Sequence, residues 1–137
     1  MRRIAATLAV VGALLFSSGA AWADWDDGVA AYERGDYVTA LREWRPLAEQ
    51  GNAEAQTDLA MLYFYGEGVA VNYFKSMKWN HKAAMQGDAG GQTSVGTHYS
   101  RGLGVPVNHT EAMKWWRKAA GQGHEGAKVR VNRLEAK

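Results

Sequence analysis

The sequence of 137 residues contains no cysteine and only two prolines. Without cysteine, a disulfide framework and thiol chemistry are both excluded, and with them the enzymes that use a cysteine nucleophile. The absence does not argue against export, because a repeat protein with a continuous apolar core needs no cross-links. The chain is long enough for one small domain with its own core.

Recognisable catalytic and metal-binding motifs are also missing. The four histidines form neither a His-x-x-x-His pair nor a close histidine–carboxylate motif, so the pattern predicts no metal site. No serine lies in a Gly-x-Ser-x-Gly elbow. The segments Gly66-Glu67-Gly68 and Gly102-Leu103-Gly104 lack the third glycine and the Gly-Lys-Ser/Thr of phosphate loops. We therefore predict that the protein is not an enzyme and has no catalytic residues, bound metal or cofactor.

The N-terminal residues have the three parts of a secretory signal peptide. Arg2 and Arg3 precede an apolar run over residues 4–16, and Ala21-Trp22-Ala23 provides a small-x-small cleavage site. We predict cleavage after Ala23, which leaves 114 of the 137 residues in the periplasm or outside the cell. The alternative is an uncleaved N-terminal anchor, although the run is shorter than the about 20 apolar residues of a transmembrane helix. We expect no transmembrane segment after cleavage.

The two N-terminal arginines account for the net charge of +2, and the other charges are unevenly distributed. Residues 24–69 carry ten acidic and three basic side chains, a net charge of −7, whereas residues 70–137 carry eleven basic and four acidic ones, a net charge of +7. In a protein whose elements follow the sequence order, this predicts an acidic end and a basic end. The basic end suits an anionic partner or head-to-tail association, and the alternative is that both ends are solvated helix faces.

The rest of the chain is organised around a repeat with a period of 36 residues. Residues 51–86 align with residues 87–122 without a gap, and 17 of the 36 positions are identical. Similarity in the same phase continues on both sides of this pair. We therefore predict an N-terminal helix pair at 24–50, repeats at 51–86 and 87–122, and a C-terminal capping helix at 123–137.

Each repeat is predicted to form two antiparallel helices, because its apolar residues recur at spacings of three and four. Asn72 and Asn108 are expected to cap the second helix of their repeats, and Glu111 to complete a capping box at Asn108. Gly66 lies where the end of a helix requires a left-handed residue. Pro46 is expected to bend its helix without ending it. These signals predict seven helices and no strand.

Both repeats carry spaced glycines, a Lys-Trp pair and an Ala-Ala pair. In the first repeat these are Tyr63, Gly66-x-Gly68-Val69, Lys78-Trp79 and Ala83-Ala84-x-x-Gly87, and the same pattern returns in residues 99–123. Together they resemble the Sel1-like repeat family, which is related to the tetratricopeptide repeats. The resemblance covers residues 36–127 and implies an all-α, right-handed α/α superhelical solenoid. It also implies a scaffold or adaptor that binds proteins or peptides on a concave face.

Two adjacent tryptophans in the second repeat are expected to have different environments. Trp115 aligns with Trp79, which we assign to the buried face of its helix, so the basic and aromatic residues around it do not form one nucleic-acid surface. Trp116 aligns with Asn80, a residue that tolerates water, which makes Trp116 a candidate exposed contact residue. The alternative is that Trp116 packs against the terminal helix near Val129.

If the concave surface of the family transfers, it is lined by residues opposite the buried stripe of the first helix in each repeat. With Trp116, these residues make up the predicted partner-binding set, which also contains Asp58, Met61, Leu62, Tyr65, Ser94, His98 and Arg101. The alternative is that Met61, Leu62 and Tyr65 pack between neighbouring helices.

Taken together, these features predict an exported, non-enzymatic scaffold that binds a protein or peptide of the cell envelope, and no nucleic acid. Two alternatives remain open. One is association with envelope glycan or lipid through the basic C-terminal half, which salt would weaken steeply. The other is a weak hydrolase of cell-wall material, for which Glu54 and Asp58 would be the acid–base pair.

Overall fold

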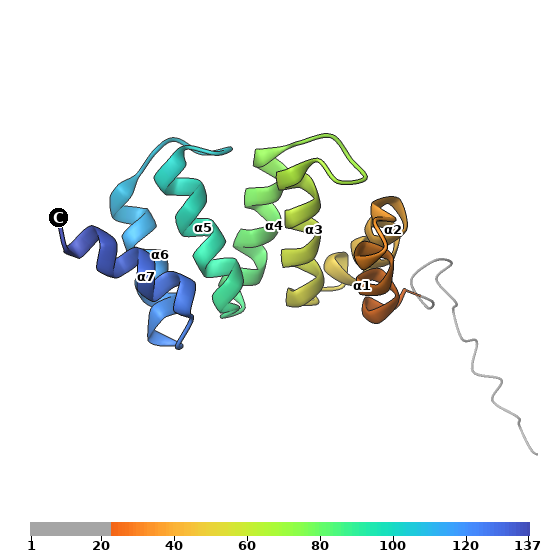
Figure 1. Cartoon of the computed structure of the whole chain (residues 1–137), viewed down its shortest axis with the longest axis horizontal. Coiled ribbons are helices and arrows are strands. Elements are labelled where there is room, and N and C mark those ends of the chain that lie inside the picture. The colour runs from red at the N-terminus through yellow and green to blue at the C-terminus, as the bar shows by residue number, and fades with distance from the viewer. Residues whose placement is uncertain (1–22) are drawn as a thin grey trace, which may run out of the picture.

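The computed structural model of the protein describes residues 23–137, so the predicted signal peptide, residues 1–23, lies outside the described residues except for Ala23. Within the described range the chain forms seven helices and no strand, as predicted (Figure 1). Helix α2 continues through Pro46, so the proline does not end it. The helices are α1 (Trp25–Glu33), α2 (Tyr37–Glu49), α3 (Ala53–Tyr65), α4 (Tyr73–Met85), α5 (Ala89–Arg101), α6 (His109–Gly121) and α7 (Glu125–Glu135).

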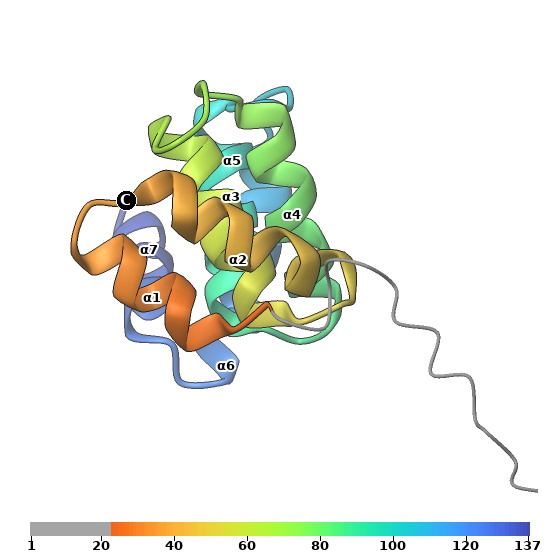
Figure 2. The ribbon, with the colours of Figure 1, turned by 90° about the vertical axis from the view of Figure 1, so that its right-hand side faces the viewer.

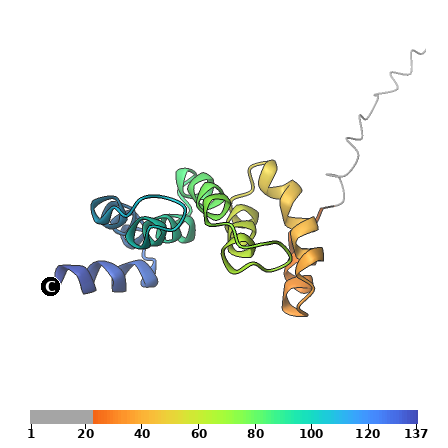
Figure 3. The same ribbon diagram turned by 90° about the horizontal axis from the view of Figure 1, so that it is seen from above.

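Each helix packs mainly on the helices before and after it in the sequence, which makes the molecule an all-α solenoid. The helix pairs follow one another along the length of the molecule, with α1 and α2 at one end and α7 at the other (Figure 3). Seen end-on, α1 and α2 lie in front of the later helices (Figure 2). Because spatial order follows sequence order, the acidic and basic segments occupy opposite ends, as the sequence predicts.

Asparagine side chains begin the second helix of both repeats, as predicted. The side-chain oxygens of Asn72 and Asn108 accept hydrogen bonds from backbone N–H groups three residues later, at 2.9 and 3.0 Å. The predicted capping box at Asn108 is wrong. The backbone N–H of Asn108 donates to the Tyr99 carbonyl at 2.9 Å, and the Glu111 carboxylate lies 3.8 Å from Lys114 Nζ. The Asn108 N–H, which a capping box would bond to the Glu111 side chain, is therefore already bonded within the loop.

The loops at 66–72 and 102–108 lie on the same side of the molecule, the upper side in Figure 1. Each loop packs its second glycine against the preceding helix pair. A β-carbon at Gly104, whose φ is +72°, would lie 2.6 Å from the Tyr73 carbonyl oxygen at the start of α4. Gly68 lies in the same way against Tyr37 at the start of α2. These contacts hold each repeat against the one before it, so a side chain at either glycine would separate them.

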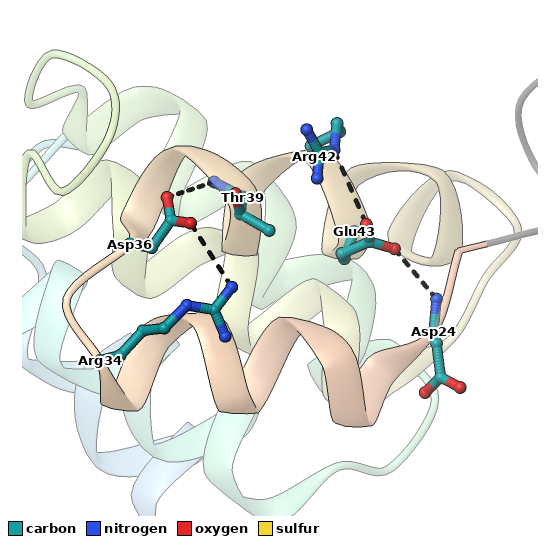
Figure 4. A network of polar contacts seen from close by, with 6 residues as sticks. All are labelled: Asp24, Arg34, Asp36, Thr39, Arg42 and Glu43. Carbon is teal, nitrogen blue, oxygen red and sulfur yellow. Dashed lines mark hydrogen bonds and ion pairs between the residues drawn. The ribbon is translucent and has the colours of Figure 1, made fainter.

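Helices α1 and α2 are also joined by polar contacts at the acidic end (Figure 4). Asp36 caps α2 by accepting from the Thr39 N–H at 3.2 Å, and it pairs with Arg34 at 3.5 Å. The Glu43 carboxylate accepts from the Asp24 N–H at 3.3 Å. Exposed ion pairs contribute little to stability, about 0–1 kcal/mol each, so apolar packing holds this pair of helices together.

The buried apolar side chains form clusters between consecutive helices. The first cluster spans α1–α3 and contains Trp44, the second joins α4–α6 around Trp115, and the third joins α6 to α7 around Trp116. Trp79 is only half-buried, contrary to expectation, and Lys82 Nζ lies 4.8 Å from the centre of its ring. Since each cluster is local, the stability of the fold is close to a sum over neighbouring repeats. None of the helices in residues 23–137 is both long and apolar enough to cross a membrane.

Candidate functional site

An open cavity of about 370 Å³ lies between α3 and α5, with α4 as its floor. Both α3 and α5 pack against α4, and the space between them is left uncovered. One residue of α7, Arg130, lies at its edge. We call this cavity the groove. Its lining residues are Thr57, Asp58, Met61, Phe64, Tyr65, Ser76, Asn80, Gly90, Thr93, Ser94, Thr97, His98 and Arg130.

Most of the predicted partner-binding residues lie along this groove. They are Asp58, Met61, Tyr65, Ser94 and His98. Leu62 is a correction, because it is fully buried in the cluster between α1 and α3 and packs between helices as the alternative proposed. Arg101 is exposed at the end of α5 but does not line the groove. The sequence missed Ser76 and Asn80, because both belong to the second helix of the repeat.

Trp116 is not the exposed contact residue of the predicted set, and the alternative, that it packs against the terminal helix, is confirmed. Its side chain is only 5% exposed, and its indole N–H donates to the Thr93 carbonyl at 3.0 Å. It packs against α7 through Ala127 and Val131, whereas Val129 points to solvent. Its counterpart Asn80, taken as a residue that tolerates water, is itself only 5% exposed, so alignment with Asn80 does not indicate exposure at Trp116.

The first helix pair repeats the arrangement found around Trp116. The Trp44 indole N–H donates to the Trp25 carbonyl at 3.2 Å. Each indole lies against a glycine of the preceding helix, Gly28 for Trp44 and Gly96 for Trp116, where an added β-carbon would collide with the ring. The two tryptophan–glycine pairs are therefore equivalent. Residues 24–50 form a helix pair of the same design as the second repeat.

The middle helix pair, α3 and α4, departs from this design. Asn80 lies 36 residues after Trp44 and 36 before Trp116, and Ala60 lies 36 before Gly96. An asparagine thus replaces the tryptophan, and an alanine replaces the glycine. The asparagine side chain lines the groove, at the level where the other pairs hold an indole. The 36-residue period alone could have shown this departure, since Trp44, Asn80 and Trp116 follow one another at that spacing in the sequence.

The floor of the groove is a hydrogen-bonded set of neutral groups. The Nδ1–H of His98 donates to the Leu103 carbonyl at 2.7 Å, which leaves Nε2 as an acceptor in the neutral ring. Ser76 Oγ lies 3.3 Å from that Nε2, and Asn80 Nδ2 lies 3.5 Å from it. Burial lowers the pKa of His98 below its usual value. The Phe64 ring meets the imidazole edge-on at 5.7 Å, so the floor is held in one arrangement.

The groove has one acidic and one basic side chain in its lining, Asp58 and Arg130. Asp58 is half-buried, and its carboxylate accepts from the Trp25 indole N–H at 2.7 Å. Burial raises the pKa of Asp58, against the opposing effect of that hydrogen bond. Glu54, the other member of the suggested hydrolase pair, is exposed one turn earlier on the same helix. The two carboxylates therefore do not face each other across the groove.

Within residues 23–137, no group of three or more histidine, aspartate or glutamate side chains is placed to hold a metal ion. The chemistry available in the groove is hydrogen bonding, apolar and aromatic contact, and one charge of each sign. These are the features of a binding site for a polypeptide or a small organic group.

Comparison with known proteins gives a consistent result. Residues 53–88 and 89–124 each match the family model described as Sel1 repeat. A Sel1 repeat protein from Oxalobacter formigenes has a similar structure, with a TM-score of 0.77, 35% identity, and coverage of 81% of this chain and 46% of that one. A protective antigen of uropathogenic Escherichia coli with the SLR fold gives a TM-score of 0.69, 36% identity, and coverage of 72% and 22%. This chain thus spans less than half the length of either structure. No curated protein sequence matches it.

Proposed function

Because the chain belongs to the Sel1 repeat family, we propose that it is a non-enzymatic scaffold that holds an extended segment of a partner protein in the groove between α3 and α5. The fold of this family suggests a protein-interaction scaffold. The observation that carries the proposal is the groove itself. Its volume of about 370 Å³ is within the range of ligand pockets, and its floor is already ordered by internal hydrogen bonds.

The groove suits a polypeptide because α3 lines it with apolar and aromatic side chains and α5 lines it with small polar ones. Tyr65 is 64% exposed at one side, and Met61 is half-buried beside it, so both are available as apolar anchors. Thr57, Ser94 and Thr97 line the space with small polar side chains. An ordered floor lowers the entropy cost of binding, since these residues need not rearrange around the bound segment.

We further propose that the protein is exported and that its partner belongs to the cell envelope. The support is the N-terminal sequence, with its basic residues, apolar run and Ala21-Trp22-Ala23 site. The mass of the protein recovered from a periplasmic fraction tests this. A mass that begins at Asp24 is the expected result, and an intact N-terminus on membrane-bound protein would support the anchor instead.

Site-specific photocrosslinking tests whether the groove is the interface. A photoreactive amino acid at Tyr65 is expected to capture a defined envelope protein when the full chain is expressed in its native host. Val38 is the matched control, because it is 65% exposed but lies on α2, outside the groove. A crosslink of equal yield to the same protein from both positions would contradict the proposal.

A blocking variant gives a second test. We expect Ser94→Arg to abolish the Tyr65 crosslink, because the long side chain projects into the groove. Asn132→Arg adds the same charge on the exposed surface of α7 and should leave the crosslink unchanged. If capture survives Ser94→Arg but is lost at moderate salt, association is driven by charge elsewhere on the surface.

A further inference from the structure

We infer that the groove contains a pocket for an aromatic side chain of the partner, and for an indole in particular, at the level where the flanking helix pairs hold tryptophans of their own. This inference rests on the proposed function and deepens it, because it specifies the residue type that the bound segment presents.

The two intramolecular indoles show what the repeat backbone accepts at this level. Trp44 and Trp116 each lie between the two helices of a pair, and each donates its N–H to a carbonyl of the first helix. The accepting residue lies three positions before the facing glycine in both cases, Trp25 before Gly28 and Thr93 before Gly96. The same geometry thus occurs twice in one molecule.

The middle pair has the equivalent accepting carbonyl but no indole between its two helices. Thr57 lies three residues before Ala60, so its carbonyl corresponds to the two carbonyls that accept an indole N–H elsewhere. Thr57 and Asn80 both line the groove. Asn80 is shorter than the tryptophan found at this position in the flanking pairs, and the open cavity of the groove lies beside it. The partner's side chain would enter this space from the open side of the groove.

The surrounding side chains favour a flat aromatic group with a hydrogen-bond donor. Phe64 and Met61 provide an aromatic edge and a thioether, both of which pack well against aromatic rings. The hydrogen-bond acceptors are the Thr57 carbonyl and the Asp58 carboxylate, which already accepts one indole N–H from Trp25. A buried indole N–H needs such an acceptor, whereas a phenyl ring does not use it and an aliphatic chain fills less of the space. The expected order of preference is therefore tryptophan, then phenylalanine, then leucine.

Binding of blocked amino acids to the full chain measures this preference directly. The probes are N-acetyl-tryptophanamide, N-acetyl-phenylalaninamide and N-acetyl-leucinamide, followed by protein NMR. The tryptophan probe is expected to shift the amide signals of Thr57 and Asn80 in a saturable way. The phenylalanine probe should bind about two- to tenfold more weakly, the worth of one neutral hydrogen bond. Equal binding of the three probes, or shifts confined to other residues, would overturn the inference.

A variant that restores the pattern of the flanking pairs is the sharper test. Ala60→Gly/Asn80→Trp supplies both the indole and the glycine that it needs, so the pocket should fill from within. We expect the tryptophan probe to bind at least about tenfold more weakly, while the melting temperature does not fall. Ala60→Gly alone is the control and should keep the probe site. If the double variant does not fold, Asn80→Leu fills part of the same space without the need for glycine, and unchanged probe affinity in it would overturn the inference.

The same variants separate this inference from the proposed function. If Ser94→Arg abolishes the Tyr65 crosslink but Ala60→Gly/Asn80→Trp leaves it unchanged, the groove binds a partner that does not use an aromatic anchor. If Tyr65 captures no partner although the tryptophan probe binds at Thr57, the pocket exists and the proposed polypeptide partner is wrong.

Discussion

The middle helix pair and its two neighbours share one backbone design and differ in what fills it. In the flanking pairs a buried indole lies against glycine, at Trp44 with Gly28 and at Trp116 with Gly96. In the middle pair Asn80 takes the place of the indole, and an open groove lies beside it. The proposed function therefore implies that a repeat protein can form a binding site where one large side chain is missing from an otherwise regular array.

A solenoid tolerates such an omission better than a globular core does. Each helix contacts mainly the helices before and after it, and Asn80 belongs to neither the cluster around Trp44 nor the cluster around Trp116. The polar groups beside Asn80 are buried and hydrogen-bonded, because His98 accepts from Ser76 and donates to the Leu103 carbonyl. The buried polar groups on the floor of the groove therefore have hydrogen-bond partners within the protein.

Removal of one indole should give the largest difference in stability between a flanking helix pair and the middle pair. We expect Trp116→Ala to lower the free energy of unfolding by about 3–5 kcal/mol, because it leaves a cavity between α5, α6 and α7. Asn80→Ala should cost about 1 kcal/mol, since its contact to His98 is long at 3.5 Å. Urea unfolding of the two variants measures the difference. Equal losses would show that the indole is not the main filling of its helix pair.

Substitution of the glycine that packs against the indole should change the free energy of unfolding by less, and the sign of the change should depend on the indole. Gly96→Ala is expected to cost about 1–3 kcal/mol, because the added methyl group collides with Trp116. In a Trp116→Asn background, which reproduces the middle pair, the same change should be stabilising by up to about 1 kcal/mol, since alanine is the better helix former. A double-mutant cycle measures this reversal of sign. Additive effects would mean that the glycine and the indole do not interact.

The buried histidine should give the smallest effect, seen only as the pH falls. Leu62 is the counterpart of His98 in the preceding repeat, and burial holds the pKa of His98 below that of the unfolded chain. The unfolded state then binds more protons, so stability is lost as the pH falls below about 6.5, by at most about 1.4 kcal/mol per pH unit. The urea midpoint at about pH 7.5 and about pH 5.5 measures this loss. His98→Leu should reduce the pH dependence, and an unchanged dependence would assign it to other groups.

The sequence predicted the features that depend on a few neighbouring residues. Asn72 and Asn108 cap helices because a short side-chain oxygen reaches an amide three residues later, whatever the tertiary contacts. Gly66 adopts a φ of +70°, which only the local backbone decides. The helix period and the 36-residue repeat likewise need no long-range information. The first helices also supplied several correct groove residues, because the face of α3 opposite its buried stripe follows from the helical period.

The sequence did not predict which positions of the second helices meet the next helix pair. Trp116 and Asn80 are both buried, although Trp116 was a candidate exposed residue and Asn80 was taken to tolerate water. Leu62 is part of the core although it lies outside the predicted stripe. The capping box failed for a similar reason, since the Asn108 amide is used by the Tyr99 carbonyl in the folded loop. Each of these outcomes depends on contacts between helices that are stacked in space.

By itself the sequence determined the type of element, its ends, its period and the membership of the repeat family, because these follow from backbone stereochemistry and from side chains close in the chain. Only the tertiary structure decided that the space beside Asn80 stays open and that the equivalent space at Trp116 is closed. The reason is that a helix in a solenoid is packed on two sides, by its own partner and by the next repeat. The angle between repeats therefore decides which polar and aromatic residues become wall, floor or core.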